Sequence, residues 1–195
     1  MSGTAKRKIF VDTGFAYSVT AIGGLPPLLG ERWAGVVEWP TDVRDELRVR
    51  RERPGGGLPA GLPAKTINAS GLWLPEPMEL SSDQQDAASL IVRQLGGLDA
   101  KQHAGEAACT VLAQDLGGVV ATEDYAAAAV IRTACGVQTI CVCDVLQSLI
   151  AASVWTSADV AVALNDLAAL QRPNVDGLTA TDIANGSWKD RLTKT

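Results

Sequence analysis

Short apolar runs rich in β-branched residues alternate along this chain with longer stretches of helical composition. Such alternation is typical of βαβ units, in which parallel strands form a central sheet and the connecting helices cover both of its faces. The sequence therefore predicts an α/β fold, a three-layer α/β/α sandwich with a parallel central sheet. The expected strands are KIFV (8–11), AGVVEW (34–39), GGVVAT (117–122) and VQTICVC (137–143).

Helix starts are marked by short polar patterns. Ser82-x-x-Gln85 has capping-box spacing and precedes an amphipathic stripe that ends at Gly96. Thr156-x-x-Asp159 has the same spacing and opens a late helix that Pro173 would stop. Further helices are expected at 15–22, 41–53, 105–116, 123–136 and 144–154.

Two regions do not fit this alternation. Residues 54–77 are rich in Gly and Pro, which is incompatible with a regular helix or a central strand, so we expect an irregular insertion carrying Trp73. Residues 173–195 have weak periodicity and are expected to be a tail that is loosely held or bound to a partner. The predicted organisation is one domain over residues 1–172, with the insertion at about 54–77, and a C-terminal tail over 173–195.

The charge and composition narrow the class of protein. The formal net charge of the 195 residues is −5, so any contact with nucleic acid needs a local basic patch or bound metal ions. No apolar segment has the length of a membrane span, and the stretch after Lys6-Arg7-Lys8 is too short for a signal peptide. We expect a cytoplasmic protein that does not bind membranes. The four cysteines lack paired C-x-x-C spacing and are expected to be reduced, buried thiols.

Acidic residues follow three of the expected strands. Asp12 ends the first, Glu123 and Asp124 follow the third, and Asp144 follows the fourth. Since the carboxyl ends of parallel strands share one edge, where α/β proteins bind ligands, these acids are expected to converge there. Each acid alone is equally explained as a helix N-cap. Several carboxylates close together repel one another, and a divalent cation relieves that repulsion.

Two further acids lie near helix starts. Glu46 is one turn into a helix whose buried stripe includes Val43 and Leu47, and Glu106 follows Gly105. A glutamate in a first turn is also explained by its interaction with the helix dipole. Clusters of oxygen ligands suit Mg²⁺ or Mn²⁺. The single histidine, His103, is expected to be an exposed loop or helix-start residue.

Four motifs in order resemble those of PIN-domain ribonucleases, in particular the VapC-like branch: VDTG (11–14), VRDEL (43–47), GEAACTVLA (105–113) and TEDYAAAA (122–129). The resemblance covers roughly residues 8 to 170. It implies a PIN-like fold and a divalent-metal-dependent endoribonuclease that hydrolyses phosphodiester bonds of single-stranded RNA. It also implies a homodimer and, in toxin members of toxin–antitoxin pairs, an antitoxin protein that covers the site. The chain departs from the pattern in its insertion and in CVCDVL (141–146).

The resemblance assigns a role to each matching residue. The catalytic and metal-binding tetrad, holding Mg²⁺ or Mn²⁺, would be Asp12, Glu46, Glu106 and Asp124. Bound metal ions generate a nucleophilic hydroxide from water and stabilise charge on phosphorus, so no Ser, Cys or His nucleophile is needed. Auxiliary candidates are Thr13, which follows the first acid, Glu123, and the strand-end residue Asp144.

RNA binding would need positive charge and aromatic surface near the metal. The helix that carries Glu46 also carries a cluster of arginines, some of which are expected to guide the RNA backbone: Arg44, Arg48, Arg50, Arg51 and Arg53. The chosen candidates among them are Arg44, Arg48 and Arg51. The same arginines are equally explained as a solvated helix face with acidic partners. Tyr125, directly after the last acid of the tetrad, is a candidate for stacking on a base.

Two other classes of function remain open. The chain is alternatively a non-catalytic PIN-like module that binds nucleic acid or protein, and a titration with Mn²⁺ distinguishes the two. A phosphotransfer domain of receiver or haloacid-dehalogenase type is a third reading. The chain has DTG where a dehalogenase has D-x-D, and its acid pair comes late for a receiver.

Overall fold

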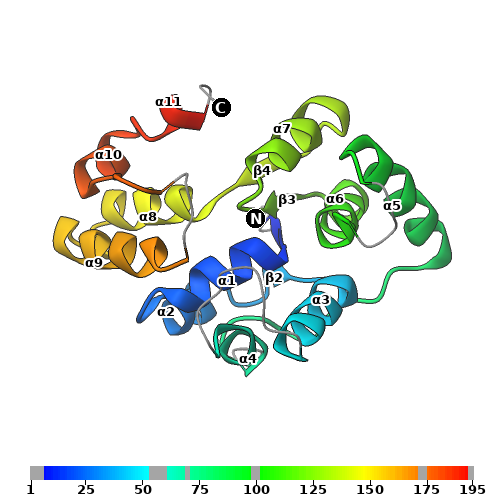
Figure 1. The fold of residues 1–195 in the computed structure, drawn as a ribbon, viewed down its shortest axis with the longest axis horizontal. Helices are drawn as coiled ribbons and strands as arrows, with labels where there is room; N and C mark the ends of the chain where they lie inside the picture. Colours follow the sequence, from blue (N-terminus) through cyan, green and yellow to red (C-terminus); the bar gives the residue numbers. More distant parts are fainter. Residues whose placement is uncertain (1–6, 53–60, 69–70, 98–101, 171–174, 193–195) are drawn as a thin grey trace, which may run out of the picture.

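The computed structural model describes residues 7–52, 61–68, 71–97, 102–170 and 175–192, and for residues 51, 52, 191 and 192 only the backbone. Its centre is a sheet of four parallel strands in the order β2-β1-β3-β4 (Figure 1). In register, Val11 on β1 lies opposite Ala121 on β3. The prediction of an α/β fold with a parallel central sheet is confirmed. The strands are β1 (Lys8–Val11), β2 (Val37–Glu38), β3 (Gly118–Ala121) and β4 (Gln138–Ile140).

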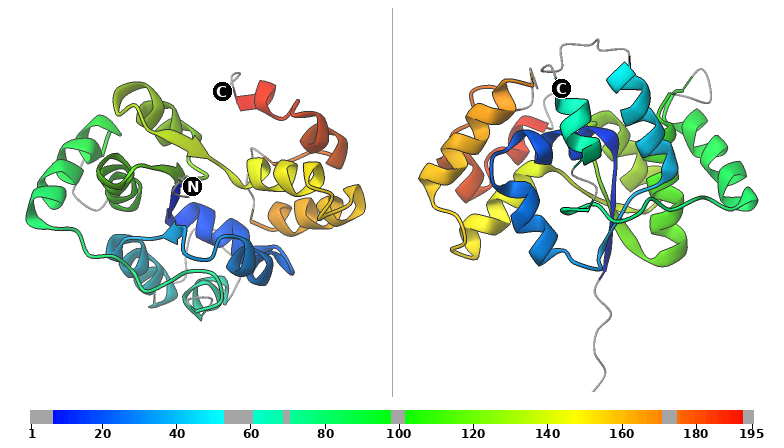
Figure 2. Two further views of the ribbon diagram at one scale, coloured as in Figure 1. Left: turned by 180° about the vertical axis from the view of Figure 1, so that it is seen from behind. Right: turned by 90° about the horizontal axis from the view of Figure 1, so that it is seen from below.

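Helices cover both faces of the sheet. On one side α6 packs directly on β1 and β3, with α5 outside it, and on the other side α1, α8 and α9 lie together (Figures 1 and 2). α3 contacts α1, α4 and α6. The helices are α1 (Thr13–Ala21), α2 (Leu25–Arg32), α3 (Thr41–Glu52), α4 (Leu62–Asn68), α5 (Ser82–Gln94), α6 (Ala104–Leu116), α7 (Tyr125–Ala134), α8 (Val142–Ala151), α9 (Ser157–Ala168), α10 (Ala180–Asn185) and α11 (Lys189–Leu192).

The core lies between the sheet and these helices. Phe10 and Val11 on β1 are fully buried, and Phe15 on α1 stacks on Trp33 with ring centroids 6.3 Å apart. Burying a side chain of this size contributes about 1.5–3 kcal/mol. The apolar residues of β1 therefore hold the strand rigidly in place, up to the point where Asp12 begins.

The two predicted capping boxes have different outcomes. The one at Thr156 and Asp159 is confirmed at the start of α9. The other lies one residue earlier than predicted, because Ser81 caps α5 and its partner is Gln84. The segment SSDQQ offers the S-x-x-Q spacing in two registers, so the pattern alone could not select one.

The Gly/Pro-rich stretch 54–77 is partly regular, contrary to expectation. Its residues 62–68 form α4, which packs on α1 and α3 and buries Leu62, Pro63 and Thr66. Pro63 is tolerated because it stands in the first turn, where a helix needs no donor from it. Trp73 is buried as well. Residues 54–60 and 69–70 of the predicted insertion lie outside the described residues.

The expected strand over 137–143 is too long. β4 ends at Ile140, and Cys141 already caps α8, so that Asp144 is the third residue of that helix. The carboxylate of Asp144 accepts a hydrogen bond from the N–H of Cys141 at 3.0 Å. Alternating apolar residues suggested a strand, but this local hydrogen bond favours the helix start.

The C-terminal segment differs from the loosely held tail that was expected. Over its described residues it forms α10 and α11, and α10 packs on α8 and α9. Ile183 and Trp188 are both buried there. Helices this short cannot show a periodic apolar pattern, which is why the sequence did not reveal them. None of the helices in the described ranges is long and apolar enough to cross a membrane.

Candidate metal centre

Two of the predicted acids stand where neighbouring strands end. Asp12 directly follows β1, and its N–H donates to the carbonyl of Ala121 on β3 at 3.0 Å. Asp124 follows β3 by three residues. Both carboxylates cap the next helix: Oδ1 of Asp12 accepts from Phe15 N at 2.6 Å, and Oδ1 of Asp124 from Ala127 N at 2.9 Å. The capping explanation is therefore correct, but it uses one oxygen of each acid.

The second carboxylate oxygen of Asp12, Oδ2, is not used in helix capping. Oδ2 of Asp12 is buried and has no hydrogen-bond partner among the residues that the structure describes. The Asp12 side chain is only 1% exposed. Leaving a buried polar atom without a partner costs about 1–3 kcal/mol, and more for a charged group. Such an atom calls for a ligand or a proton.

Glu46 is held in place by two hydrogen bonds from other elements. Thr13, the first residue of α1, donates its hydroxyl to Oε2, and the N–H of Gly105 donates to Oε1 at 3.2 Å. A Cβ at position 105 would lie 3.3 Å from that Oε1 and 3.0 Å from Val43. The glycine thus lets the start of α6 come close to α3, and Thr13 orients an acid of the predicted tetrad.

Glu106 lies among the other three acids. Burial raises the pKa of Glu106, and the negative charges of Glu46 and Asp124 raise it further. Burial raises the pKa of Asp12 too, followed by the charge of Glu106, while the nearby hydroxyl of Thr122 and the hydrogen bond from the N–H of Phe15 oppose the shift. The structure therefore brings all four predicted acids to one place at the carboxyl edge of the sheet.

Cys109, one turn further along α6, is close enough to the same acids for their charges to affect its pKa. Burial raises the pKa of the Cys109 thiol, and the carboxylates of Asp12, Glu106 and Glu46 add to the rise. An uncharged thiol is the favoured state there. The negative potential of the cluster thus extends into the core beneath it.

His103 joins this cluster, which the sequence interpretation did not anticipate. Its Nδ1 lies 4.0 Å from Oε2 of Glu106 and 3.9 Å from Oδ2 of Asp124. One ligand atom from each of these three residues lies within 4.8 Å of the others. The only signal in the sequence was that this single histidine precedes Glu106 by three residues, and the left-handed backbone of His103 at the N-cap of α6 is not predicted by helical spacing.

The auxiliary candidates have separate placements. Glu123 is buried, and its Oε1 accepts from the N–H of Val142 at the start of α8 at 2.6 Å. Its charge still contributes to the raised pKa of Asp12. Asp144 instead lies 3.6 Å from the ammonium of Lys189 and belongs to the start of α8. Glu123 therefore borders the cluster, whereas nothing places Asp144 in it.

The predicted RNA-binding arginines are not brought to the acids. Arg44 pairs with Asp45 at 2.9 Å, and both Arg44 and Arg48 line a cavity of about 260 Å³ beside Trp39. Residues two apart on a helix do not share a face, so Arg44 and Arg48 point away from Glu46. Arg50, four residues after Glu46, lies on the same side as that acid. The side chain of Arg51 lies outside the described residues.

Tyr125 is half-buried rather than presented to solvent. Its hydroxyl oxygen is buried, and burial raises the pKa of the phenol, with the nearby thiols of Cys141 and Cys143 and the charge of Glu123 contributing. The ring packs against the core. Its predicted role in stacking on a base gains no support from this placement.

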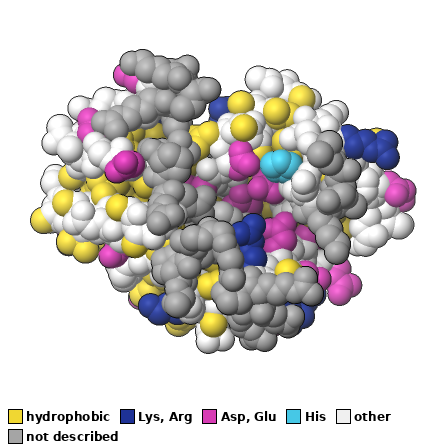
Figure 3. All heavy atoms as spheres, in the orientation of Figure 1, with side chains coloured by type: hydrophobic (Ala, Val, Ile, Leu, Met, Phe, Trp, Pro, Cys, Tyr) yellow, Lys and Arg dark blue, Asp and Glu magenta, His cyan; other side chains and the backbone are white. Residues whose placement is uncertain are grey.

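The cluster opens to solvent on one face of the molecule. Figure 3 shows acidic side chains gathered around the histidine at the centre of this face, with a basic side chain beside them. Exposure rises outward, from the buried Asp12 to Glu106 at 18% and Asp124 at 37%. The donor set of carboxylate oxygens and one imidazole nitrogen fits a divalent cation, and the outer side of the cluster is open to solvent.

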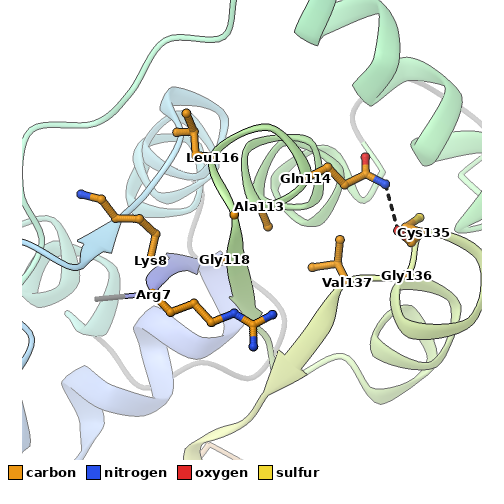
Figure 4. Close-up of a pocket in the computed structure, with 10 residues that line it drawn as sticks. Arg7, Lys8, Ala113, Gln114, Leu116, Gly118, Cys135, Gly136 and Val137 are labelled. Atoms are coloured by element: carbon orange, nitrogen blue, oxygen red, sulfur yellow. Dashed lines mark hydrogen bonds between the residues drawn. The ribbon is translucent and has the colours of Figure 1, made fainter. Parts of the chain in front are cut away.

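A larger cavity lies at the opposite end of the strands. It has a volume of about 770 Å³ and is bordered by the amino ends of β1 and β3 (Figure 4). Arg7 donates to Oε1 of Gln138 at 2.5 Å, and Gln114 donates to the carbonyl of Cys135 at 3.0 Å. None of the predicted site residues lines this cavity.

No protein family, no curated protein and no solved structure matches this chain.

Proposed function

We propose that this protein is a divalent-metal-dependent nuclease that hydrolyses phosphodiester bonds of single-stranded RNA, in the manner of the PIN-domain ribonucleases. One observation carries the proposal. Glu106 on α6 lies close enough to Glu46 on α3, to Asp124 after β3 and to Asp12 after β1 for their charges to interact, and the buried Oδ2 of Asp12 lacks a partner in the described part of the chain.

A purely structural role accounts for this arrangement only in part. Helix capping explains one oxygen of Asp12 and one of Asp124. It does not explain why Glu106 is held close enough to both to be destabilised by their charges. Such repulsion lowers the stability of the metal-free protein, and a cation would offset it.

The residues around the proposed metal would have separate roles in binding the metal ion and the RNA. Asp12, Glu46, Glu106 and Asp124 would hold Mg²⁺ or Mn²⁺, with Glu46 oriented by Thr13 and Gly105. The bound ion would supply a hydroxide from water and neutralise charge on the phosphate. Asp124, which is more exposed than Asp12 and Glu106, would face the approaching substrate. Of Arg44, Arg48 and Arg50, only Arg50 is on the side of α3 that carries Glu46, and it would contact the RNA backbone.

Further parts of the proposal concern partners. If the chain is the toxin of a toxin–antitoxin pair, an antitoxin protein would cover the exposed side of the cluster and suppress cleavage. The resemblance also suggests a homodimer. Sedimentation of the purified chain measures its oligomeric state, and co-purification with the product of a neighbouring small gene tests for the antitoxin.

The decisive experiment is cleavage of labelled single-stranded RNA in the presence of Mn²⁺ or Mg²⁺. Asp12→Asn and Asp124→Asn should each reduce cleavage by more than about 100-fold, because even the loss of an outer-shell partner of a metal costs 10–100-fold. Asp86→Asn, an exposed acid in the middle of α5, is the matched control and should cleave normally. Unchanged cleavage by both cluster variants would reject the proposal, and metal binding without any cleavage would indicate a non-catalytic binding module.

A further inference from the structure

His103 has an unusual backbone for a residue with a side chain. It stands at the N-cap position of α6 with φ 58°, in the left-handed region, and its side chain makes no capping hydrogen bond within the described structure. Left-handed backbone is unfavourable for most residues with a Cβ, although Asn, Asp and His tolerate it better than others. In this conformation the imidazole lies near Glu106 in the first turn of α6 and near Asp124 after β3.

The imidazole lies between two candidate metal ligands. Its Nδ1 is 4.0 Å from Glu106 Oε2 and 3.9 Å from Asp124 Oδ2, so neither contact is a hydrogen bond. The ring is partly exposed, at 30%. A nitrogen at this distance from two carboxylate oxygens leaves room for an ion between them.

An independent observation also points to a missing cation in this cluster. Oδ2 of Asp12 is buried, has no hydrogen-bond partner in the part of the chain that the structure describes, and lies in the electric field of Glu106. Asp12 and His103 come from different elements, the end of β1 and the start of α6. Two features that share no local cause therefore lead to the same place.

The type of donor bears on which ion fits. Mg²⁺ prefers oxygen ligands and is held by carboxylates and water. Imidazole nitrogen is a better ligand for first-row transition metals, whose affinity for a mixed N/O site rises from Mn²⁺ through Co²⁺ to Ni²⁺. One nitrogen among carboxylates thus shifts selectivity away from Mg²⁺.

We propose that His103 Nδ1, Glu106 and Asp124 together bind a first-row transition-metal dication, Mn²⁺ rather than Mg²⁺, with His103 as the residue that sets this preference. The inference rests on the proposed metal-dependent function, because it concerns the same cluster. It goes further by choosing between the two ions and by adding a ligand that the tetrad does not contain.

The test compares the dissociation constants of Mn²⁺ and Mg²⁺ for the full chain, measured by titration calorimetry. The wild type should bind Mn²⁺ at least about tenfold more tightly than Mg²⁺, and His103→Asn should lose most of that preference, mainly through weaker Mn²⁺ binding. Asparagine tolerates left-handed backbone, so this variant should keep the start of α6 intact. Asp86→Asn should retain the wild-type preference.

A spectroscopic readout supports the titration without relying on affinity. Pulsed electron paramagnetic resonance of the Mn²⁺-loaded wild type should show hyperfine coupling to an imidazole nitrogen, and His103→Asn should lose it. Mn²⁺ binding that lacks this coupling, or an unchanged Mn²⁺ preference in the variant, would overturn the inference and leave the proposed function standing. Absence of any metal binding in the wild type would reject both.

Discussion

The amino and carboxyl edges of the central sheet, where the parallel strands begin and end, differ in whether their charged groups have partners. At the amino edge Arg7 donates to Gln138, and Lys8, the first residue of β1, pairs at 2.6 Å with Glu38, the last residue of β2. At the carboxyl edge four acids and one histidine converge, and an oxygen of Asp12 lacks a partner among the described residues. The amino edge also has a cavity of about 770 Å³. The candidate site in this fold is therefore identified by its unsatisfied charge and not by the size of a cavity.

Removing one acid of the cluster and, separately, the acid that pairs with Lys8 should give the largest contrast. Glu106→Gln should weaken Mn²⁺ binding more than about 100-fold, because its carboxylate lies among the other three acids. Glu38→Gln breaks the Lys8 pair at the other edge and should leave Mn²⁺ binding unchanged, with a stability loss of about 0–1 kcal/mol. Calorimetry and chemical unfolding measure the two quantities. Equal effects of the two variants on Mn²⁺ binding would remove the distinction between the edges.

Stability without metal should depend on pH through the carboxyl edge. Burial and the charge of Glu106 raise the pKa of Asp12 in the folded state above its value in the unfolded chain. The protonated carboxyl therefore adds to the free energy of unfolding at pH values below the unfolded-state pKa. This contribution is lost as the pH rises through the folded-state pKa. Asp12→Asn should therefore be more stable than the wild type at neutral pH, by about 1–3 kcal/mol. The gap should shrink toward pH values near 4, where the unfolded carboxylate itself takes up a proton. Urea unfolding in EDTA measures the gap, and a gap of the opposite sign would contradict the assigned burial.

Two glycines offer a matched comparison of the edges. Gly105→Ala places a Cβ 3.3 Å from Glu46 Oε1 and should weaken Mn²⁺ binding about tenfold by displacing that acid. Gly118→Ala at the amino edge places a Cβ 2.6 Å from the ring of Phe10, which should cost about 1–3 kcal/mol of stability. Mn²⁺ binding by the folded Gly118 variant should be normal. The reverse pattern would show that Gly105 does not position Glu46.

The smallest expected effect concerns RNA. Arg50→Gln should raise the KM for single-stranded RNA a few-fold, since one phosphate contact is lost. Arg44→Gln, a change on the face of α3 away from Glu46, should change it less. Steady-state cleavage at two salt concentrations measures both. A stronger effect of Arg44→Gln would restore the arginines first expected.

Much of the fold and of the candidate site followed from the sequence because the signals were local. Apolar runs predicted the strands, and the acids at their ends predicted which edge holds the site. The end of β4 could not be predicted, because Cys141 and Cys143 alternate with apolar residues as a strand would, while the Asp144 cap favours a helix.

The missed features depend on contacts or on faces rather than on local pattern. His103 joins the acids through a left-handed backbone that no spacing rule predicts. Among the arginines of α3, Arg50 is four positions from Glu46 and on the same side, whereas Arg44 and Arg48 are two positions away and on another face. The C-terminal helices are stabilised by burial of Ile183 and Trp188 against the domain, which the sequence of the segment itself does not show.

The central claim is that the carboxyl edge of the sheet is a cation site. The most direct test is a crystal soaked with Mn²⁺ and measured near the manganese absorption edge. If the carboxyl edge binds a cation, an anomalous peak should lie within coordination distance of Asp12 Oδ2, or of His103, Glu106 and Asp124. Crystals of Asp12→Asn should lack this peak. A saturating soak that gives no peak at these residues, or a peak only at the amino edge, would contradict it.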